Sequence, residues 1–220
     1  MSAAEVWAIG RIADRDGPRL WPSARAERLA AAADAAVVLA SHGIIAADPV
    51  VVVSMMGEGV QFVPVEDAIE HLQAVVMPLD ATARDAKHLA AFVRSYSIRA
   101  VVGLGRAPVD ALAGSGCLEL LQGVPLVFAR SDVHADLRAA GIAPLACDVV
   151  GPTLALECSA RAGAHVIGGW QVAVDSGADG SAGRVVLSND RHAAVRTDCL
   201  RRVVVDHCAC GCAAPRLEPA

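Results

Sequence analysis

The sequence predicts an α/β protein in which a mostly parallel sheet, flanked by helices, is followed by a smaller β-rich subdomain. Up to about residue 150, short β-branched runs alternate with alanine-rich or amphipathic runs. Such alternation with short connections is typical of a parallel sheet covered by helices. After residue 151 the helical signals become scarce, and cysteines and histidines gather near the end of the chain. We therefore expect two domains, residues 1–150 and 151–220, the second held together by zinc.

The first predicted helix covers residues 22–39, with Ser23 as its N-cap and Gly43 close behind its end. Its alanine-rich sequence has high helix propensity, and glycine commonly ends helices. Residues 49–55 form a continuous β-branched run between a proline and a glycine, which indicates a strand buried on both faces. The helical period then returns over residues 65–73.

The same alternation continues to about residue 140. We expect strands over residues 74–79, 98–104 and 124–129, and helices over residues 83–96, 108–113 and 131–140. Asp80 or Thr82 would cap the helix over residues 83–96. In the second domain, the segments with β character are residues 166–174, 183–188 and 200–205.

The charge and composition exclude several classes of function. The net charge is −5 without a basic run, and only 3% of the residues are aromatic, which argues against a nucleic-acid partner. No stretch contains the about 18 consecutive apolar residues of a membrane span. The N-terminus lacks the basic and apolar regions of a signal peptide. We expect a cytoplasmic protein whose cysteines stay reduced.

Five of the seven cysteines follow residue 157, and their grouping predicts a metal site. Cys208 and Cys210 lie in a Cys-x-Cys-Gly motif, and Cys158 and His165 form a second pair with six residues between them. Thiolate sulfur and imidazole nitrogen suit Zn²⁺, which takes four such ligands in structural sites. A full shell of protein ligands leaves no position for water, so we predict a structural zinc site.

The residues beside this motif leave alternatives open. His207 or Cys212 could replace one of the four ligands. The cysteines could also be buried without a metal, because free cysteine packs as a small apolar residue. A third hypothesis is metal or thiol handling through Cys208, Cys210 and Cys212, which predicts fast exchange of the metal.

Motifs for phosphate binding or nucleophilic catalysis are weak. Gly103-x-Gly105 lies at the end of the strand over residues 98–104, and Gly114-x-Gly116 lies in an expected turn. We interpret both as ordinary turns, because neither precedes a helix in the way that a phosphate-binding loop requires. No Gly-x-Ser-x-Gly motif supports a nucleophilic serine.

The order of several segments resembles that of the phenylacetate–CoA ligase family, a branch of the adenylate-forming enzymes, which activate carboxylates with ATP. The resemblance covers about residues 11–217. Its segments are AVVMPL (74–79, beside GATVIPL), IRAVVGL (98–104, beside PTVLVGTPS), residues 124–148 (beside IFGAE…YDIYG), GPTLALEC (151–158, beside GPGVAGEC), GAHV (163–166, beside GLHV), GRVVLSN (183–189, beside GELVLTT), VRTDCL (195–200, beside YRTGDL) and CACG (208–211, beside CPCG). In that family the Glu-Cys…His and Cys-x-Cys-Gly elements hold zinc, so the resemblance implies the same four ligands.

The nucleotide-binding motifs of the family are not matched. Its Ser/Thr/Gly-rich phosphate loop should lie where residues 12–18 hold one glycine and two acids, which would repel a triphosphate. Its YGLSE motif, whose Glu helps to hold Mg-ATP, is missing between Val150 and Gly151. Its ribose-binding Asp aligns with Cys199, beside Asp198. The C-terminal lid domain with the catalytic lysine, and an N-terminal segment, have no counterpart.

We therefore expect a truncated homologue that is non-catalytic for adenylation and binds neither ATP nor AMP well. It would bind a partner, as a homo-oligomer or with a full-length relative, because missing segments expose apolar surface. It could also bind a small aryl or acyl ligand. The alternative is an enzyme acting on an aryl or acyl carboxylate, or its adenylate or CoA derivative, through the inherited cleft. Asp14, Asp198 and Cys199 are the candidate residues for that activity.

Overall fold

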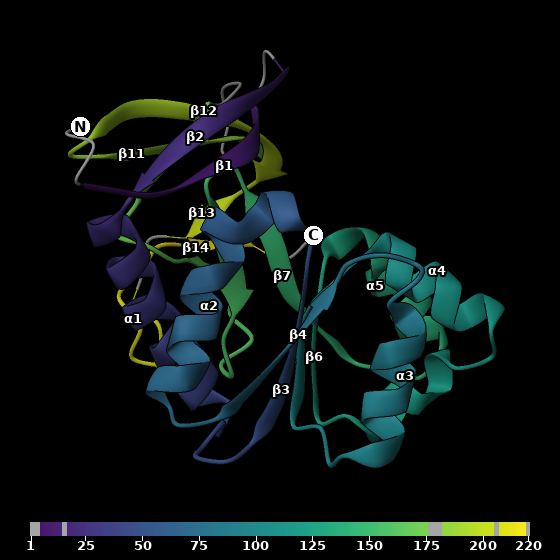
Figure 1. Cartoon of the computed structure of the whole chain (residues 1–220). Coiled ribbons are helices and arrows are strands. Elements are labelled where there is room, and N and C mark those ends of the chain that lie inside the picture. Colours follow the sequence, from purple (N-terminus) through teal and green to yellow (C-terminus); the bar gives the residue numbers. More distant parts are fainter. Residues whose placement is uncertain (1–4, 15–16, 176–181, 205–206, 219–220) are drawn as a thin grey trace.

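The computed structural model describes residues 5–14, 17–175, 182–204 and 207–218. A mixed sheet of nine strands forms the centre of the molecule (Figure 1). In spatial order the strands are β13 (Val203–Val204), β14 (Arg216–Leu217), β9 (Ala164–Val166), β8 (Thr153–Glu157), β7 (Pro144–Val150), β6 (Leu126–Ala129), β5 (Ala100–Leu104), β3 (Pro49–Ser54) and β4 (Val75–Asp80). The predicted α/β class is confirmed.

Strands β4, β3, β5, β6 and β7 run parallel, and helices cover both faces of this part of the sheet. The helices α1 (Arg25–Ser41) and α2 (Gly59–His71) lie on one face, as Figure 1 shows. The helices α3 (Ala86–Ser95), α4 (Arg106–Gly114) and α5 (His134–Ala139) lie on the other. Alternate residues of β3 enter the two cores: Val50 and Val52 face α1 and α2, whereas Val51 and Val53 face α3 to α5. The predicted strand buried on both faces is correct.

Beyond β7 the sheet continues with antiparallel pairs. A tight hairpin pairs Val150 of β7 with Thr153 of β8, and β9, β14 and β13 follow by antiparallel pairing. The boundary expected between residues 150 and 151 falls inside this hairpin, between two strands of one sheet. The division into domains 1–150 and 151–220 stays a prediction.

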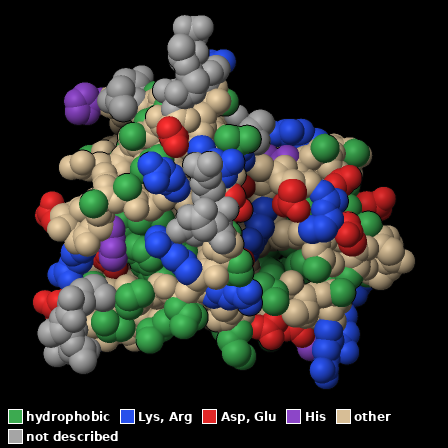
Figure 2. All heavy atoms as spheres, turned by 90° about the horizontal axis from the view of Figure 1, so that it is seen from above, with side chains coloured by type: hydrophobic (Ala, Val, Ile, Leu, Met, Phe, Trp, Pro, Cys, Tyr) green, Lys and Arg blue, Asp and Glu red, His purple; other side chains and the backbone are tan. Residues whose placement is uncertain are grey.

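Two smaller sheets pack together at one end of the molecule. The hairpin of β1 (Val6–Asp14) and β2 (Gly17–Ala24) faces the three-stranded sheet of β10 (Gln171–Asp175), β11 (Gly183–Asn189) and β12 (His192–Arg201) (Figure 1). A third core lies between them and the main sheet; it includes Ile12, Trp21, Val185, Leu187 and Val195. The face seen in Figure 2 carries basic and acidic side chains together.

Several predicted boundaries differ from the structure. Helix α1 begins at Arg25, because Pro22 and Ser23 belong to β2. The side chain of Glu27 accepts the N–H of Ala24 at 2.9 Å, while the Ser23 hydroxyl accepts the indole N–H of Trp7. Helix α2 begins six residues earlier than predicted, at Gly59, and the expected strand over residues 166–174 is two strands.

The break between β9 and β10 has a clear physical cause. Gly168 and Gly169 have positive φ angles of 103° and 69°, which favour glycine. Both N–H groups point to the carboxylate of Asp34 in α1, at 2.8 and 3.4 Å. The chain therefore turns away from the main sheet at this point and is fastened to α1. Strands β1, β2, β7 and β8 and most of β12 were not predicted.

Gly103-x-Gly105 connects β5 to α4, which begins at Arg106, two residues before the predicted helix start at residue 108. Gly103 has a φ of +91° and lies against the backbone carbonyl oxygen of Val53 and the ring of Phe62. Its role is therefore close packing between β5, β3 and α2. No helix in the described part of the chain is long and apolar enough to cross a membrane.

Candidate metal centre and cleft

Three cysteines and one histidine converge beside the antiparallel half of the main sheet. The ligand atoms of Cys158, His165, Cys208 and Cys210 all lie within 4.8 Å of one another. Cys158 and Cys208 have their sulfurs 3.4 Å apart, and Cys210 has its sulfur 3.2 Å from Nε2 of His165. Cys158 and His165 are fully buried. The group that the sequence predicted is therefore brought together in space, and it could hold a metal ion.

Strand pairing explains how two distant segments meet. Cys158 directly follows β8 and His165 lies in β9, which pairs with β8. Strand β14 pairs with the other edge of β9, with Arg216 opposite His165. This pairing brings the loop that precedes β14, and with it Cys208 and Cys210, over the two buried ligands. Gly211, with a φ of +85°, supplies the tight turn within the loop.

Groups around the cluster orient its ligands. The Nδ1–H of His165 donates to the carbonyl oxygen of Ala214 at 2.8 Å, which leaves Nε2 free to act as a ligand. Burial lowers the pKa of His165, so the imidazole is kept in the neutral form that binds metals. The N–H of Cys212 donates to the sulfur of Cys210 at 3.4 Å. Cys212 is buried beside the cluster, but neither it nor His207 belongs to the four convergent ligands.

The thiols of the cluster differ in acidity. Burial and the neighbouring Cys208 raise the pKa of Cys158 to about 12. Burial also opposes ionisation of Cys208, but N–H groups of Cys210 and Ala209 and the neighbouring thiols outweigh it and lower that pKa. Three ionised thiols in this space would repel one another strongly without a cation. The donor set therefore fits a bound cation that prefers sulfur and nitrogen.

A polar cleft of about 490 Å³ opens at the carboxyl ends of β6 and β7. This is where open α/β sheets usually bind their ligands. Residues from five separate segments line it, and those with polar side chains are Arg11, Glu58, Gln61, Arg130, Ser131, Asp132, Asp148 and Asp198. Four of these side chains are carboxylates and two are guanidinium groups, and three of the carboxylates form ion pairs: Glu58 with Arg130, Asp132 with Arg106 and Asp148 with Arg201.

Many of the polar groups in the cleft bind one another. Arg130 contacts Glu58 at 2.7 Å. Asp148 accepts hydrogen bonds from the N–H and hydroxyl of Ser131, at 2.9 and 2.6 Å, and from Arg201 at 3.0 Å. Gln61 is only 2% exposed and donates to the carbonyl oxygen of Gly151. These contacts connect η2 (Met56–Glu58), β7, β12 and the segment after β6. They also pair charged groups that could otherwise bind a substrate.

The three candidate residues for catalysis have different positions. Asp198 is exposed on β12 and lines the cleft. Cys199 is half-buried, packs against the third core and does not line the cleft; burial raises its pKa to about 11. Successive strand residues point to opposite faces, which explains the difference. Asp14 ends β1, and its side chain lies outside the part of the chain that the structure describes.

Short hairpins stand at two positions where the resemblance implies nucleotide-binding loops. Asp14 pairs with Gly17, so only two residues connect β1 and β2. Val150 pairs with Thr153, so only two residues connect β7 and β8. The sequence analysis missed Arg130, Ser131 and Asp148. Arg130 and Ser131 directly follow a predicted parallel strand, which was a usable signal, whereas Asp148 lies within β7, which was not predicted.

Comparison with known proteins identifies the fold. No protein-family model matches the sequence, and neither does any curated protein. A structure of 2-hydroxyisobutyryl-CoA ligase in complex with 2-HIB-AMP and CoA matches with a TM-score of 0.70 and 16% identity, over 100% of this chain and 53% of that one. A malonyl-CoA ligase with methylmalonyl-CoA and AMP matches with a TM-score of 0.56 and 14% identity, over 95% and 51%.

The N-terminal subdomain of NpsA from Klebsiella oxytoca, in complex with 3-hydroxyanthranilyl-AMSN, matches with a TM-score of 0.59 and 12% identity, over 95% of this chain and 61% of that one. The chain thus spans about half to three-fifths of the length of these structures. The TM-scores of 0.56 to 0.70, over 95% or more of this chain, show that it shares the fold of these structures, although the identities are only 12 to 16%. The chain has the fold of the adenylate-forming acyl-CoA ligases.

Proposed function

We propose that this chain is a zinc-stabilised protein of the phenylacetate–CoA ligase-like branch, which does not adenylate carboxylates and acts by binding a partner or a small ligand. The observation that carries this proposal is the pair of two-residue hairpins, at Asp14–Gly17 and Val150–Thr153. A phosphate-binding loop needs a run of backbone N–H groups that surround an anion. Two-residue connections between paired strands do not offer such a run.

The cleft supports the same conclusion. Three of its carboxylates, Glu58, Asp132 and Asp148, form ion pairs with Arg130, Arg106 and Arg201. Mg-ATP and acyl adenylates are anionic, and these paired arginines are not free to bind them. Because Arg130 is already paired with Glu58, it would have to leave this half-buried ion pair before it could bind a phosphate.

We assign Zn²⁺ to Cys158, His165, Cys208 and Cys210, because three thiolates and one imidazole at these separations match its usual structural sites. The ion would connect the loop after β13 to β8 and β9. With four protein ligands it would stabilise the fold rather than catalyse a reaction. Retention of four reduced ligands suits the cytoplasm, where thiols are kept reduced.

Calorimetric titration of the zinc-loaded protein with Mg-ATP, and then with AMP, tests the absence of adenylation. We expect no saturable heat, which corresponds to dissociation constants weaker than ~1 mM. The 2-hydroxyisobutyryl-CoA ligase, whose structure contains an acyl adenylate, is a suitable positive control. Binding of either nucleotide at micromolar concentration would show that the nucleotide site survives and that the proposal is wrong.

A second candidate is an enzyme that acts on an aryl or acyl carboxylate, or its activated derivative, in the remaining cleft. It is favoured by Arg11 and Asp198, which line the cleft and form no ion pair with another described residue. A screen of carboxylates with ATP and CoA, read out as pyrophosphate release, would reveal this activity. Activity that persists in an Asp198→Ala variant would exclude Asp198 as its catalytic residue.

A further inference from the structure

Helix α1 exposes a row of apolar side chains, called here the apolar stripe, to solvent. Leu29 is 62% exposed and Val37 is 40% exposed, and Ala26, Ala33 and Ala40 are exposed with them. Their spacing of three, four, four and three residues places them on one side of the helix. The stripe is about 21 Å long, at about 1.5 Å per residue. Among the described residues nothing covers it, although soluble proteins seldom leave a continuous apolar surface of this kind without a partner.

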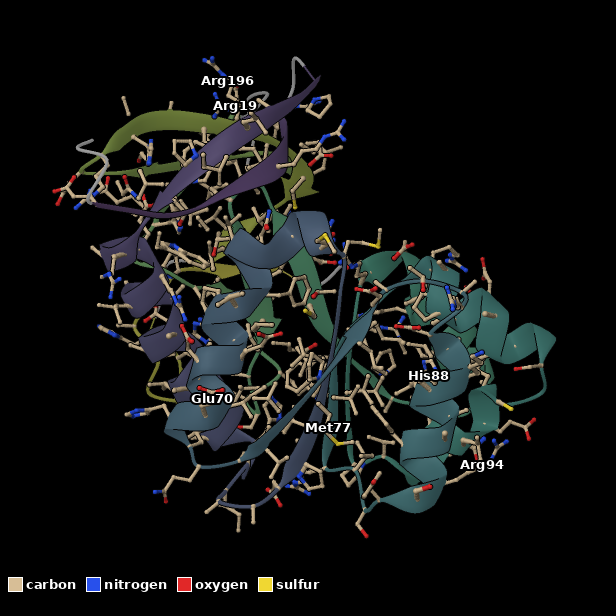
Figure 3. The ribbon with its side chains drawn as sticks, in the orientation of Figure 1. Arg19, Glu70, Met77, His88, Arg94 and Arg196 are labelled. Atoms are coloured by element: carbon tan, nitrogen blue, oxygen red, sulfur yellow. The ribbon has the colours of Figure 1, made fainter. Side chains whose placement is uncertain are left out.

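A groove adjoins the stripe, so the surface is shaped as well as apolar. It has a volume of about 440 Å³ and lies between α1 and α2. Trp7, Leu29, Ala32 and Ala33 contribute its apolar lining. In Figure 3, Glu70 lies on the part of α2 that is next to α1. A ridge with a groove beside it is the form by which two helices pack.

The stripe is symmetric about Ala33. Leu29 and Val37 stand four residues to either side of it, and Ala26 and Ala40 stand seven residues to either side. If two copies of α1 cross at Ala33 in antiparallel orientation, Leu29 of each copy meets Val37 of the other. Ala26 likewise meets Ala40, and the small Ala33 at the centre lets the helices approach closely. A two-fold interface requires this self-complementarity.

The charges of α1 favour the antiparallel orientation. Arg25, the first residue of the helix, is exposed and has no hydrogen bond or ion pair with another described residue. The last turn of α1 contains no basic residue to complement the negative end of the helix dipole. Antiparallel copies place Arg25 of each beside the last turn of the other, whereas parallel copies would place the two Arg25 side chains together.

We propose that the chain forms a two-fold homodimer through α1, with the two helices antiparallel and crossing at Ala33. This inference extends the partner-binding part of the proposed function by naming the partner, a second copy of the chain. It does not depend on the zinc site or on nucleotide binding. The dimer buries Leu29 and Val37 of both copies and covers the groove between α1 and α2.

Sedimentation of the zinc-loaded full chain over a wide concentration range tests the proposal. We expect the wild type to be a dimer and an Ala33→Arg variant to be a monomer, because two like charges would meet at the axis. The dissociation constant of the dimer should rise by about 100-fold or more. An Ala91→Arg variant, with the same change at an exposed alanine of α3, should remain a dimer. Unchanged circular dichroism would show that both variants fold.

Two further variants test the partner and the orientation. An equimolar mixture of Ala33→Arg and Ala33→Glu chains should form heterodimers, because opposite charges then meet at the axis. A Leu29→Glu, Val37→Arg double variant should dimerise only if the helices are antiparallel, because each carboxylate then meets a guanidinium group of the other copy. A monomeric wild type, or a dimer that survives Ala33→Arg, would overturn the proposal while leaving the zinc and nucleotide titrations interpretable. Failure of the double variant to dimerise would overturn the antiparallel arrangement.

Discussion

A Cys158→Ser variant will bind less than one zinc ion per chain and will unfold far below the wild type. Cys158 is fully buried, and its sulfur lies 3.4 Å from that of Cys208. Zinc binding in such sites contributes directly to folding, because the site does not exist in the unfolded chain. We expect the free energy of unfolding to fall by about 4 kcal/mol, which for a chain of this size lowers the melting temperature by about 8–16 °C.

Elemental analysis measures the zinc content of this variant, and calorimetry measures its melting temperature. A Cys117→Ser variant is the matched control, because Cys117 is a free cysteine between α4 and β6, outside the metal cluster. It should keep one zinc per chain and the wild-type melting temperature. Stoichiometric zinc in Cys158→Ser, or wild-type stability after complete removal of zinc with a chelator, would contradict the assignment of a structural ion.

A Gly103→Ala variant will also be severely destabilised, although the change adds only one methyl group. Gly103 has a φ of +91°, which strains residues with a side chain. An added Cβ would overlap the carbonyl oxygen of Val53 and lie 2.5 Å from the ring of Phe62. Because β3, β5 and α2 are all buried there, none can move without cost. Overpacking and backbone strain together should cost about 3 kcal/mol or more.

A Gly114→Ala variant is the matched control for Gly103→Ala. Gly114 ends α4, has no positive φ, and has no atom within 4 Å of an added Cβ. Its variant should lie within about 0.5 kcal/mol of the wild type. Urea unfolding of the two variants and the wild type measures the difference. Equal midpoints for Gly103→Ala and Gly114→Ala would show that the packing around Gly103 is not the constraint that we infer.

The proposed function depends on two separate parts of the molecule. The proposed zinc ion would connect the loop before β14 to β8 and β9, whereas Arg11 of β1 and Gly151 of the β7–β8 hairpin line the cleft on the carboxyl side of β6 and β7. Removal of zinc would therefore weaken the fold without creating a nucleotide site. Conversely, a test of nucleotide binding is informative only on zinc-loaded protein.

The sequence alone determined four of the five parallel strands, β3 to β6, and the four cysteine and histidine side chains that converge. A strand buried on both faces must be a continuous apolar run, and β3 contains such a run, from Val50 to Val53. Zinc accepts few residue types, so Cys158, His165, Cys208 and Cys210 could be selected by chemistry before their positions in space were known.

Only the tertiary structure decided the remaining features. Strands β1, β2 and β12 carry charged residues or prolines on exposed positions, and their strand conformation comes from pairing with neighbours rather than from local preference. The cleft joins side chains from β1, η2 (Met56–Glu58), α2, β12 and the ends of β6 and β7, which no local pattern connects. The choice of Asp198 over Cys199 at this cleft depends on which face of β12 points inward, and packing against the third core sets that face.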